Sequence, residues 1–218
     1  MGAWGRGLVL GSVLAISLIV GLPLSPRTAT AEDGTHSQST KLAKRTARAS
    51  KDVDRYVARL ETTEQALWAV SQAQGRTLRQ DYELFRKHLR SLEDAEKATR
   101  SEIHDMKAAG VKYAASWDAA NAKIADAELK QASVERRTTV MKEYEEVTAS
   151  LGEIGRQLQP FTSNLRDLEA FLGADLSPVH VLGARDAIQK SQADAQALKQ
   201  SIAPVQARLK QFMTEAPR

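Results

Sequence analysis

The spacing of apolar residues constrains this chain more than any other feature. From about Leu42 to Phe212, apolar side chains recur three or four positions apart. This period aligns side chains on one face of a helix, whereas a half-buried strand would alternate at every second position. The clearest stripe consists of Val140, Tyr144, Val147, Leu151, Ile154, Leu158, Phe161, Leu165, Leu168 and Leu172. The pattern predicts an all-α fold, and the low aromatic content of 5% agrees with it.

Turn signals divide the stripes into four helices. Gly75 follows the first stripe as a C′ glycine, and Thr77 with Gln80 has the form of a capping box for the next helix. Asp126 is a candidate N-cap for the third helix, and Ser177 is a candidate N-cap for the fourth.

We expect these helices to form an elongated antiparallel bundle that resembles a coiled coil. Gly110 lies inside the second stripe, which continues in phase beyond it, so the helix is expected to pass through this glycine. At about 1.5 Å per residue the second helix would be about 70 Å long, which predicts a rod. The expected helices span about 41–73, 77–125, 129–172 and 178–213.

Residues that weaken a helix gather within the third stripe. Gly152 and Gly155 each lower helix stability, and Pro160 removes one backbone hydrogen bond. The segment from Gly152 to Pro160 is therefore either a bend that acts as a hinge or a helix–helix contact that needs small residues.

The first 31 residues resemble a secretory signal. Arg6 precedes an apolar stretch from Leu8 to Leu22, and Ala29 to Ala31 has the small-x-small form of a cleavage site. We therefore predict a signal peptide over 1–31, and an exported, periplasmic bacterial protein. The alternative is an uncleaved inner-membrane anchor with the bundle facing the periplasm. The polar residues 32–40 are expected to form a disordered linker before a helical bundle domain over 41–214.

Net charge argues against nucleic acid as a partner. The formal charge is +4, and cleavage after Ala31 would lower it to +2 because Arg6 and Arg27 would be removed. Nucleic-acid binding normally needs a larger basic excess. Lysines and arginines do gather at Lys41, Lys44, Arg45, Arg48 and Lys51. They form either a face that meets anionic phospholipid or a solvated helix start.

No pattern of a catalytic, cofactor-binding or metal site occurs in the sequence. The chain has no cysteine. Helix-bundle metal sites use Glu three residues before His, whereas Phe85, Ser101 and Ser177 precede His88, His104 and His180 at that distance. Nucleophile elbows and glycine-rich phosphate loops are also missing. We therefore expect a protein that is not an enzyme and holds no cofactor.

Several weak features together resemble a known family. They are Tyr113 and Trp117, Leu129-Lys130, Ser133, Arg137, Tyr144, Leu158-x-Pro160-Phe161, Phe171-Leu172, Leu176 and Ala187-Ile188. In this order and spacing, residues from about 112 to 202 resemble the bacterial domain of unknown function 2959. The sequence departs from that family at Asp175-Leu176-Ser177, where the family tends to have Asn-Leu-Asn. The resemblance implies a helical fold with a turn just before Leu129, and it implies no activity.

These observations favour a non-enzymatic binding or scaffold protein of the cell envelope, with a protein partner or self-association. Trp68, beside the first stripe, is a candidate contact with another helix or chain. One alternative is a membrane-surface protein held by its N-terminus or by the basic residues around Lys44. Another is a bundle enzyme or ligand carrier with a site beside Gly152–Pro160, near Tyr144.

Overall fold

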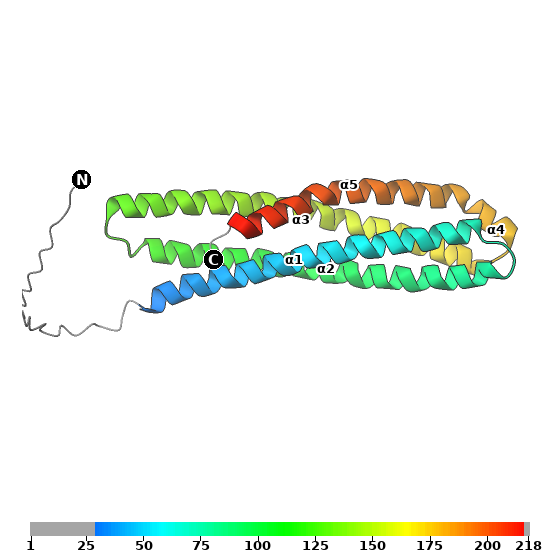
Figure 1. Cartoon of the computed structure of the whole chain (residues 1–218), viewed down its shortest axis with the longest axis horizontal. Helices are drawn as coiled ribbons and strands as arrows, with labels where there is room; N and C mark the ends of the chain where they lie inside the picture. The colour runs from blue at the N-terminus through cyan, green and yellow to red at the C-terminus, as the bar shows by residue number, and fades with distance from the viewer. Residues whose placement is uncertain (1–28, 216–218) are drawn as a thin grey trace, which may run out of the picture.

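The structure, a computed structural model, describes residues 29–215, and it contains four long helices and one short helix. The helices are α1 (Ala29–Gln72), α2 (Thr77–Asn121), α3 (Ala127–Ala174), α4 (Pro178–Gly183) and α5 (Arg185–Glu215). Figure 1 shows that the long helices lie side by side and form a rod. The prediction of an all-α, elongated bundle is confirmed.

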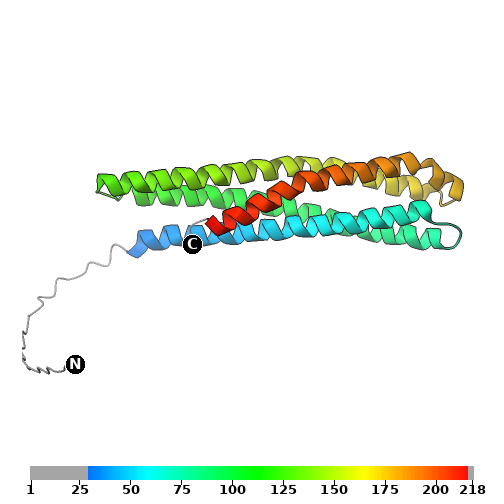
Figure 2. The ribbon, with the colours of Figure 1, turned by 45° about the horizontal axis from the view of Figure 1, so that its top comes forward.

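Each long helix packs against two neighbours. α1 packs against α2 and α5, and α3 also packs against α2 and α5. The two views show that consecutive long helices run in opposite directions (Figure 1, Figure 2). The start of α1 and the α2–α3 turn lie at one end of the rod, which we call the terminal end, and α5 stops short of it. α4 lies at the other end, which we call the α4 end.

The core follows the predicted stripes. Every residue of the α3 stripe is buried, and most residues of the stripes on the other helices are buried in the same way. Fully buried side chains in the core include Tyr56, Leu60, Phe85, Leu89, Leu92, Met106, Leu151, Leu158, Leu172 and Leu209. The apolar spacing therefore determines which face of each helix is buried.

The predicted linker over 32–40 is wrong, because α1 already begins at Ala29. Thr35 donates a hydrogen bond of 3.2 Å to the backbone carbonyl of Ser116 in α2, and Ser39 is only 6% exposed. The segment lacks apolar side chains, but its small polar residues pack against α2 and satisfy their hydroxyl groups on backbone carbonyls. Tertiary packing extends the helix where composition alone favours disorder.

The turn between α1 and α2 confirms one predicted signal and corrects another. Gly75 has φ of 59°, the left-handed conformation expected of a C′ glycine. The capping box is wrong: Arg76 is the N-cap and makes no side-chain capping bond. Thr77 is already the first helical residue, so its hydroxyl donates instead to the carbonyl of Gln74 at 3.2 Å.

Two other helix boundaries differ from those expected. α2 ends at Asn121 and not near residue 125, because Lys123 and Ile124 donate backbone hydrogen bonds three residues back and tighten the chain into a turn. The last predicted helix is divided at Ala184, whose N–H donates to the carbonyl of Val181. The N-caps Asp126 and Ser177 are confirmed, since their side chains accept from the N–H groups three residues on.

Two tyrosine–glycine contacts hold α2 against α3. The Tyr144 hydroxyl donates to the carbonyls of Met106 and Lys107 at 3.0 and 3.2 Å, and its ring occupies the space that a Cβ at Gly110 would need. Tyr82 donates to the carbonyl of Glu169 at 3.0 Å, and its hydroxyl lies where a side chain on Gly173 would begin.

Polar residues inside the stripes find partners within the chain. Glu64 pairs with Lys199 at 2.8 Å, and both side chains are mostly buried. Glu96 pairs with Arg100 at 3.3 Å, and Thr99 donates to the carbonyl of Asp52 at 3.2 Å. Each of these three polar side chains within the apolar stripes is therefore paired inside the bundle.

The signal peptide predicted over 1–31 lies almost wholly outside the described residues. Within 29–215, no helix is long and apolar enough to cross a membrane.

α3 remains a single helix through Pro160. A Cβ at Gly155 would meet no atom within 4 Å, and one at Gly152 would meet only the Lys107 ammonium, so no close helix–helix contact requires these glycines. The hinge stays a prediction.

Candidate binding groove

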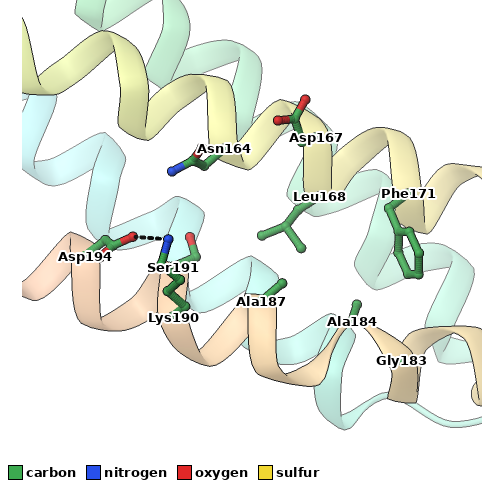
Figure 3. Close-up of a pocket in the computed structure, with 10 residues that line it drawn as sticks. All are labelled: Asn164, Asp167, Leu168, Phe171, Gly183, Ala184, Ala187, Lys190, Ser191 and Asp194. Atoms are coloured by element: carbon green, nitrogen blue, oxygen red, sulfur yellow. Dashed lines mark ion pairs between the residues drawn. The ribbon is translucent and has the colours of Figure 1, made fainter.

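A groove lies between α3 and α5 near the α4 end, with a cavity of about 320 Å³. Figure 3 shows the two helices on either side of it. Its lining consists of Asn164, Asp167, Leu168, Phe171, Gly183, Ala184, Ala187, Lys190, Ser191 and Asp194. A volume of a few hundred cubic ångströms is at the lower end of the range for ligand sites in proteins.

Small residues at the start of α5 and just before it create this groove. Ala184, between α4 and α5, is followed at helical spacing by Ala187 and Ser191 of α5, and all three point toward α3 (Figure 3). Because their side chains are short, they do not fill the space opposite Leu168, which forms the apolar floor and is 7% exposed. The α5 sequence thus leaves a hollow where larger side chains would close the contact.

Phe171 forms the wall of the groove at the α4 end. Its ring stacks on the His180 ring, with centroids 4.1 Å apart and planes inclined by 12°. The His180 Nε2 lies 2.8 Å from the backbone carbonyl of Phe171, within hydrogen-bond distance. Phe171 nevertheless remains 43% exposed, so a large aromatic face is available to a partner.

The corner that carries His180 is fixed by local hydrogen bonds. The Ser177 hydroxyl caps α4 by accepting from the His180 N–H at 3.3 Å. The Ser177 N–H and hydroxyl donate to the Asp175 carboxylate at 2.9 and 2.8 Å. These bonds favour the charged carboxylate and lower the pKa of Asp175, with the hydroxyl as the larger cause. The Phe171–His180 stack therefore rests on an ordered turn.

The rim of the groove is polar and solvated. Lys190 and Asp194 approach to 3.9 Å, with side chains 74% and 42% exposed. An ion pair this exposed contributes little to stability, so these groups are free to exchange partners. The Asp167 carboxylate points away from the gap between the helices (Figure 3).

The groove continues along α3 and α5 toward the middle of the rod. A second hollow shares Asn164 and Asp194 with the first and is lined farther on by Pro160 and Phe161. Beyond these residues, the Ser201 hydroxyl donates to Gln157 at 3.1 Å and links the two helices. The region beside Gly152–Pro160 therefore holds an open surface hollow. Tyr144 does not line it.

The strongest pKa shifts arise in the core and not in the groove. Burial raises the pKa of Tyr113 and of Tyr144 to about 12 in each case. Burial likewise raises the pKa of Tyr56 and of Tyr82. None of these tyrosines lines the groove. Their shifts reflect packing.

Histidines and acidic residues do not assemble into a metal site in the described part of the chain. Across 29–215, no three of them gather where they could hold an ion. His104 is exposed and His88 is half-buried, while His180 is engaged with Phe171.

Trp68 and Trp117 lie in different surroundings. Trp68 is 45% exposed and lines a polar hollow between α1 and α5, beside Glu64 and Lys199. Trp117 is partly buried, and its indole N–H donates to the Ser133 hydroxyl at 3.1 Å.

Phe171 is the groove residue that the apolar stripes did not identify as a candidate binding residue, because it falls beside the α3 stripe. An aromatic residue next to a stripe is the signal that points to it.

Residues that carried the family resemblance come together at the α2–α3 turn. The Tyr113 and Trp117 rings are 5.4 Å apart, and Ser133 donates to the Asn121 amide oxygen at 2.5 Å. Arg137 donates to the Asp118 carboxylate at 2.7 Å and links the two helices again. The turn before Leu129, which the resemblance implied, is present over 122–126.

Comparison with known proteins agrees with this resemblance. The model of the family described as "Protein of unknown function (DUF2959)" matches residues 30–216. Neither a curated protein nor a solved structure matches the chain. The match includes all of the bundle except its first residue, so the chain belongs to the DUF2959 family.

Proposed function

We propose that this chain is a non-enzymatic binding protein of the bacterial envelope, a rigid rod that holds a protein partner in the α3–α5 groove. The observation that carries this proposal is the exposed aromatic face of Phe171 beside a preformed hollow. A buried aromatic anchor in a pocket is the feature that most often dominates binding energy at protein interfaces.

Other exposed apolar residues lie close to the groove in sequence. Val179 and Leu182 on α4 are 81% and 64% exposed, and Gly183 between α4 and α5 lines the hollow. Exposed apolar side chains beside a preformed hollow with a solvated polar rim are typical of a surface that binds another protein. A partner helix or loop that inserts one apolar side chain against Leu168 would match the small residues of α5.

The chemistry of the groove supports binding more than catalysis. A general acid, a base or a nucleophile is usually activated by burial or by a charged neighbour inside a cleft. Lys190 and Asp194 are both exposed and pair with each other at the rim. The envelope location rests on the signal predicted over 1–31, and the family match from residue 30 is consistent with a bundle that functions after that segment.

Site-specific photo-crosslinking in cells tests the proposal. A photoreactive residue at position 187 would lie in the groove, and the matched control at Gln189 is exposed on the same helix outside it. We expect a discrete protein adduct from position 187 and none from position 189, with mass spectrometry naming the partner. Identical adduct patterns from both positions would contradict the proposal.

A further inference from the structure

We infer that the first half of α1 binds the anionic phospholipid surface of a membrane and sets the terminal end of the rod against the bilayer. The inference goes beyond the protein-binding groove, because it assigns a second surface with a different ligand. It concerns four residues that we call the basic face: Lys41, Lys44, Arg48 and Lys51.

The charge of this segment is mostly basic. After Glu32 and Asp33 near its start, the sequence from residue 34 to residue 51 has five basic residues and no acidic one, and Asp52 is the first carboxylate to follow. The members of the basic face are spaced by three, four and three residues, which puts them on one side of the helix. At about 1.5 Å per residue they form a line about 15 Å long.

The basic face is exposed and has no ion pair with any described residue. All four of its side chains are solvent-accessible. Arg45 provides the contrast: it is half-buried and pairs with Glu102 at 3.1 Å and with Asp105 at 3.0 Å. The bundle therefore neutralises the one cation that faces α2 and leaves the four outer cations available to an external anion.

An exposed apolar side chain lies near the basic face. Figure 1 places the start of α1 near the α2–α3 turn, and Leu129, just after that turn, is 66% exposed. The exposed charges around the turn are mixed, since Lys112, Lys123 and Lys130 are accompanied by Asp118, Asp126 and Glu128. A projecting apolar side chain close to a line of cations is typical of surfaces that lie in the headgroup region of a bilayer.

The groove lies at the other end of the rod from the basic face. Over 164–194, which includes α4 and the groove, the acidic residues Asp167, Glu169, Asp175, Asp186 and Asp194 outnumber the basic ones, although Arg76 and Arg79 near the start of α2 are basic at the same end. A membrane bound at the basic face would therefore leave the groove near the α4 end open to a partner.

A membrane suits this surface better than a nucleic acid does. The whole chain has a formal charge of only +4 and contains 27 acidic residues, so a polyanion that wrapped it would meet repulsion elsewhere on the rod. A flat anionic surface would meet only the basic face.

Vesicle binding with position-specific quenching tests the inference. The chain has no cysteine, so a fluorophore can be attached to a single introduced thiol at Ala47→Cys, beside the basic face, or at Gln80→Cys, at the α4 end. Vesicles contain phosphatidylcholine with or without phosphatidylglycerol, and a headgroup-attached quencher. We expect quenching at position 47 only with phosphatidylglycerol, little quenching at position 80, and release at high salt.

Matched charge variants complete the test. Neutralising the basic face should weaken binding to phosphatidylglycerol vesicles at least roughly tenfold, because each cation near such a surface adds about a factor of five. The basic-face variant is Lys41→Gln, Lys44→Gln, Arg48→Gln and Lys51→Gln. The control, which removes the same charge near the α4 end, is Arg76→Gln, Arg79→Gln, Lys87→Gln and Arg90→Gln, and it should bind normally.

Three results would overturn the inference. They are equal quenching at position 47 on neutral and anionic vesicles, equal weakening by both charge variants, and preference for soluble polyphosphate over vesicles. The crosslinking at position 187 does not depend on any of these results, so failure here would leave the proposed groove function standing. Loss of the crosslink alone would leave the membrane inference standing.

Discussion

Single residues determine how closely α2 and α3 approach. Tyr144 and Tyr82 each donate a hydrogen bond to a backbone carbonyl of the facing helix, four residues before a glycine that provides the space. The two contacts lie in consistent antiparallel register, since Gly110 is opposite Tyr144 and Tyr82 is opposite Gly173. From the sequence, both the apolar stripe and the helix were expected to continue through Gly110. The sequence did not show that the Tyr144 ring needs the space which a glycine leaves at this position.

Adding a methyl group at Gly110 should destabilise the bundle. The Cβ of Gly110→Ala would overlap the Tyr144 ring, which would have to move and lose its hydrogen bonds, at a cost of roughly 2 kcal/mol or more. The matched control is Gly155→Ala, where nothing lies within 4 Å, and which should stabilise α3 by about 1 kcal/mol. Urea denaturation measures both. Equal effects of the two substitutions would disprove the role of the Tyr144 contact.

The tyrosines should titrate late in the folded protein. All four have a raised pKa, with burial as the first cause, and Tyr113 and Tyr144 reach about 12. The folded state holds these phenolic protons to a higher pH than the unfolded chain, whose tyrosines ionise near pH 10. The unfolding free energy should therefore be unaffected below pH 9 and should fall between about pH 10 and pH 12.

Ultraviolet difference absorbance of the phenolate follows this titration directly. The native protein should show little phenolate at pH 10, whereas the chain in urea should be half ionised there. A native titration with a midpoint at pH 10 would show that the tyrosines are exposed and would contradict the packing described for Tyr144 and Tyr113.

At the scale of helices, the apolar stripes predicted element type and order, while boundaries depended on tertiary contacts. The start of α1 illustrates the difference. Residues 32–40 carry no apolar side chain, so no periodicity exists to reveal a helix. Their order depends on Ser39 and Thr35 packing against α2, which only the three-dimensional arrangement shows. The break at Ala184 was hidden for a similar reason, because the stripe continues through it.

Hydrogen exchange distinguishes the helix from a linker. Backbone amides of residues 35–40 should exchange at least roughly tenfold more slowly than in an unstructured peptide of the same sequence, because they are hydrogen-bonded within α1. Mass spectrometry of overlapping peptides from this segment provides the measurement. Exchange at the unstructured rate would restore the linker that composition predicts.

The Glu64–Lys199 pair should couple α1 to α5. The two side chains are 14% and 20% exposed, so Glu64→Leu alone leaves a mostly buried ammonium unpaired, at a cost of roughly 1–3 kcal/mol. The double variant Glu64→Leu with Lys199→Leu removes both charges and should recover most of that loss. A double-mutant cycle by urea denaturation tests this. Additive effects of the two changes would mean that the pair contributes no coupling.

At the scale of the whole molecule, the sequence predicted a rod and the structure adds two different ends. The terminal end carries the basic face and the α4 end carries the groove. Fold class, helix order and the buried faces followed from periodicity, because burial selects one face of each helix. The groove did not, because it arises where Ala184, before α5, and Ala187 and Ser191 of α5 lie opposite α3. Alanine and serine at such positions are indistinguishable in sequence from ordinary core or surface residues.

The central claim is that the groove is occupied in the cell envelope, and thiol accessibility measures this most directly. Ala187→Cys places a single thiol in the groove and Gln189→Cys places one just outside it, in a chain with no other cysteine. A small maleimide that cannot cross the inner membrane is added to intact cells and to purified protein. We expect position 187 to react slowly in cells and rapidly when purified, while position 189 reacts rapidly in both. Rapid reaction of both thiols in cells would show that the groove is empty and would contradict the proposed function. If neither thiol reacted in cells, the protein would not be exported.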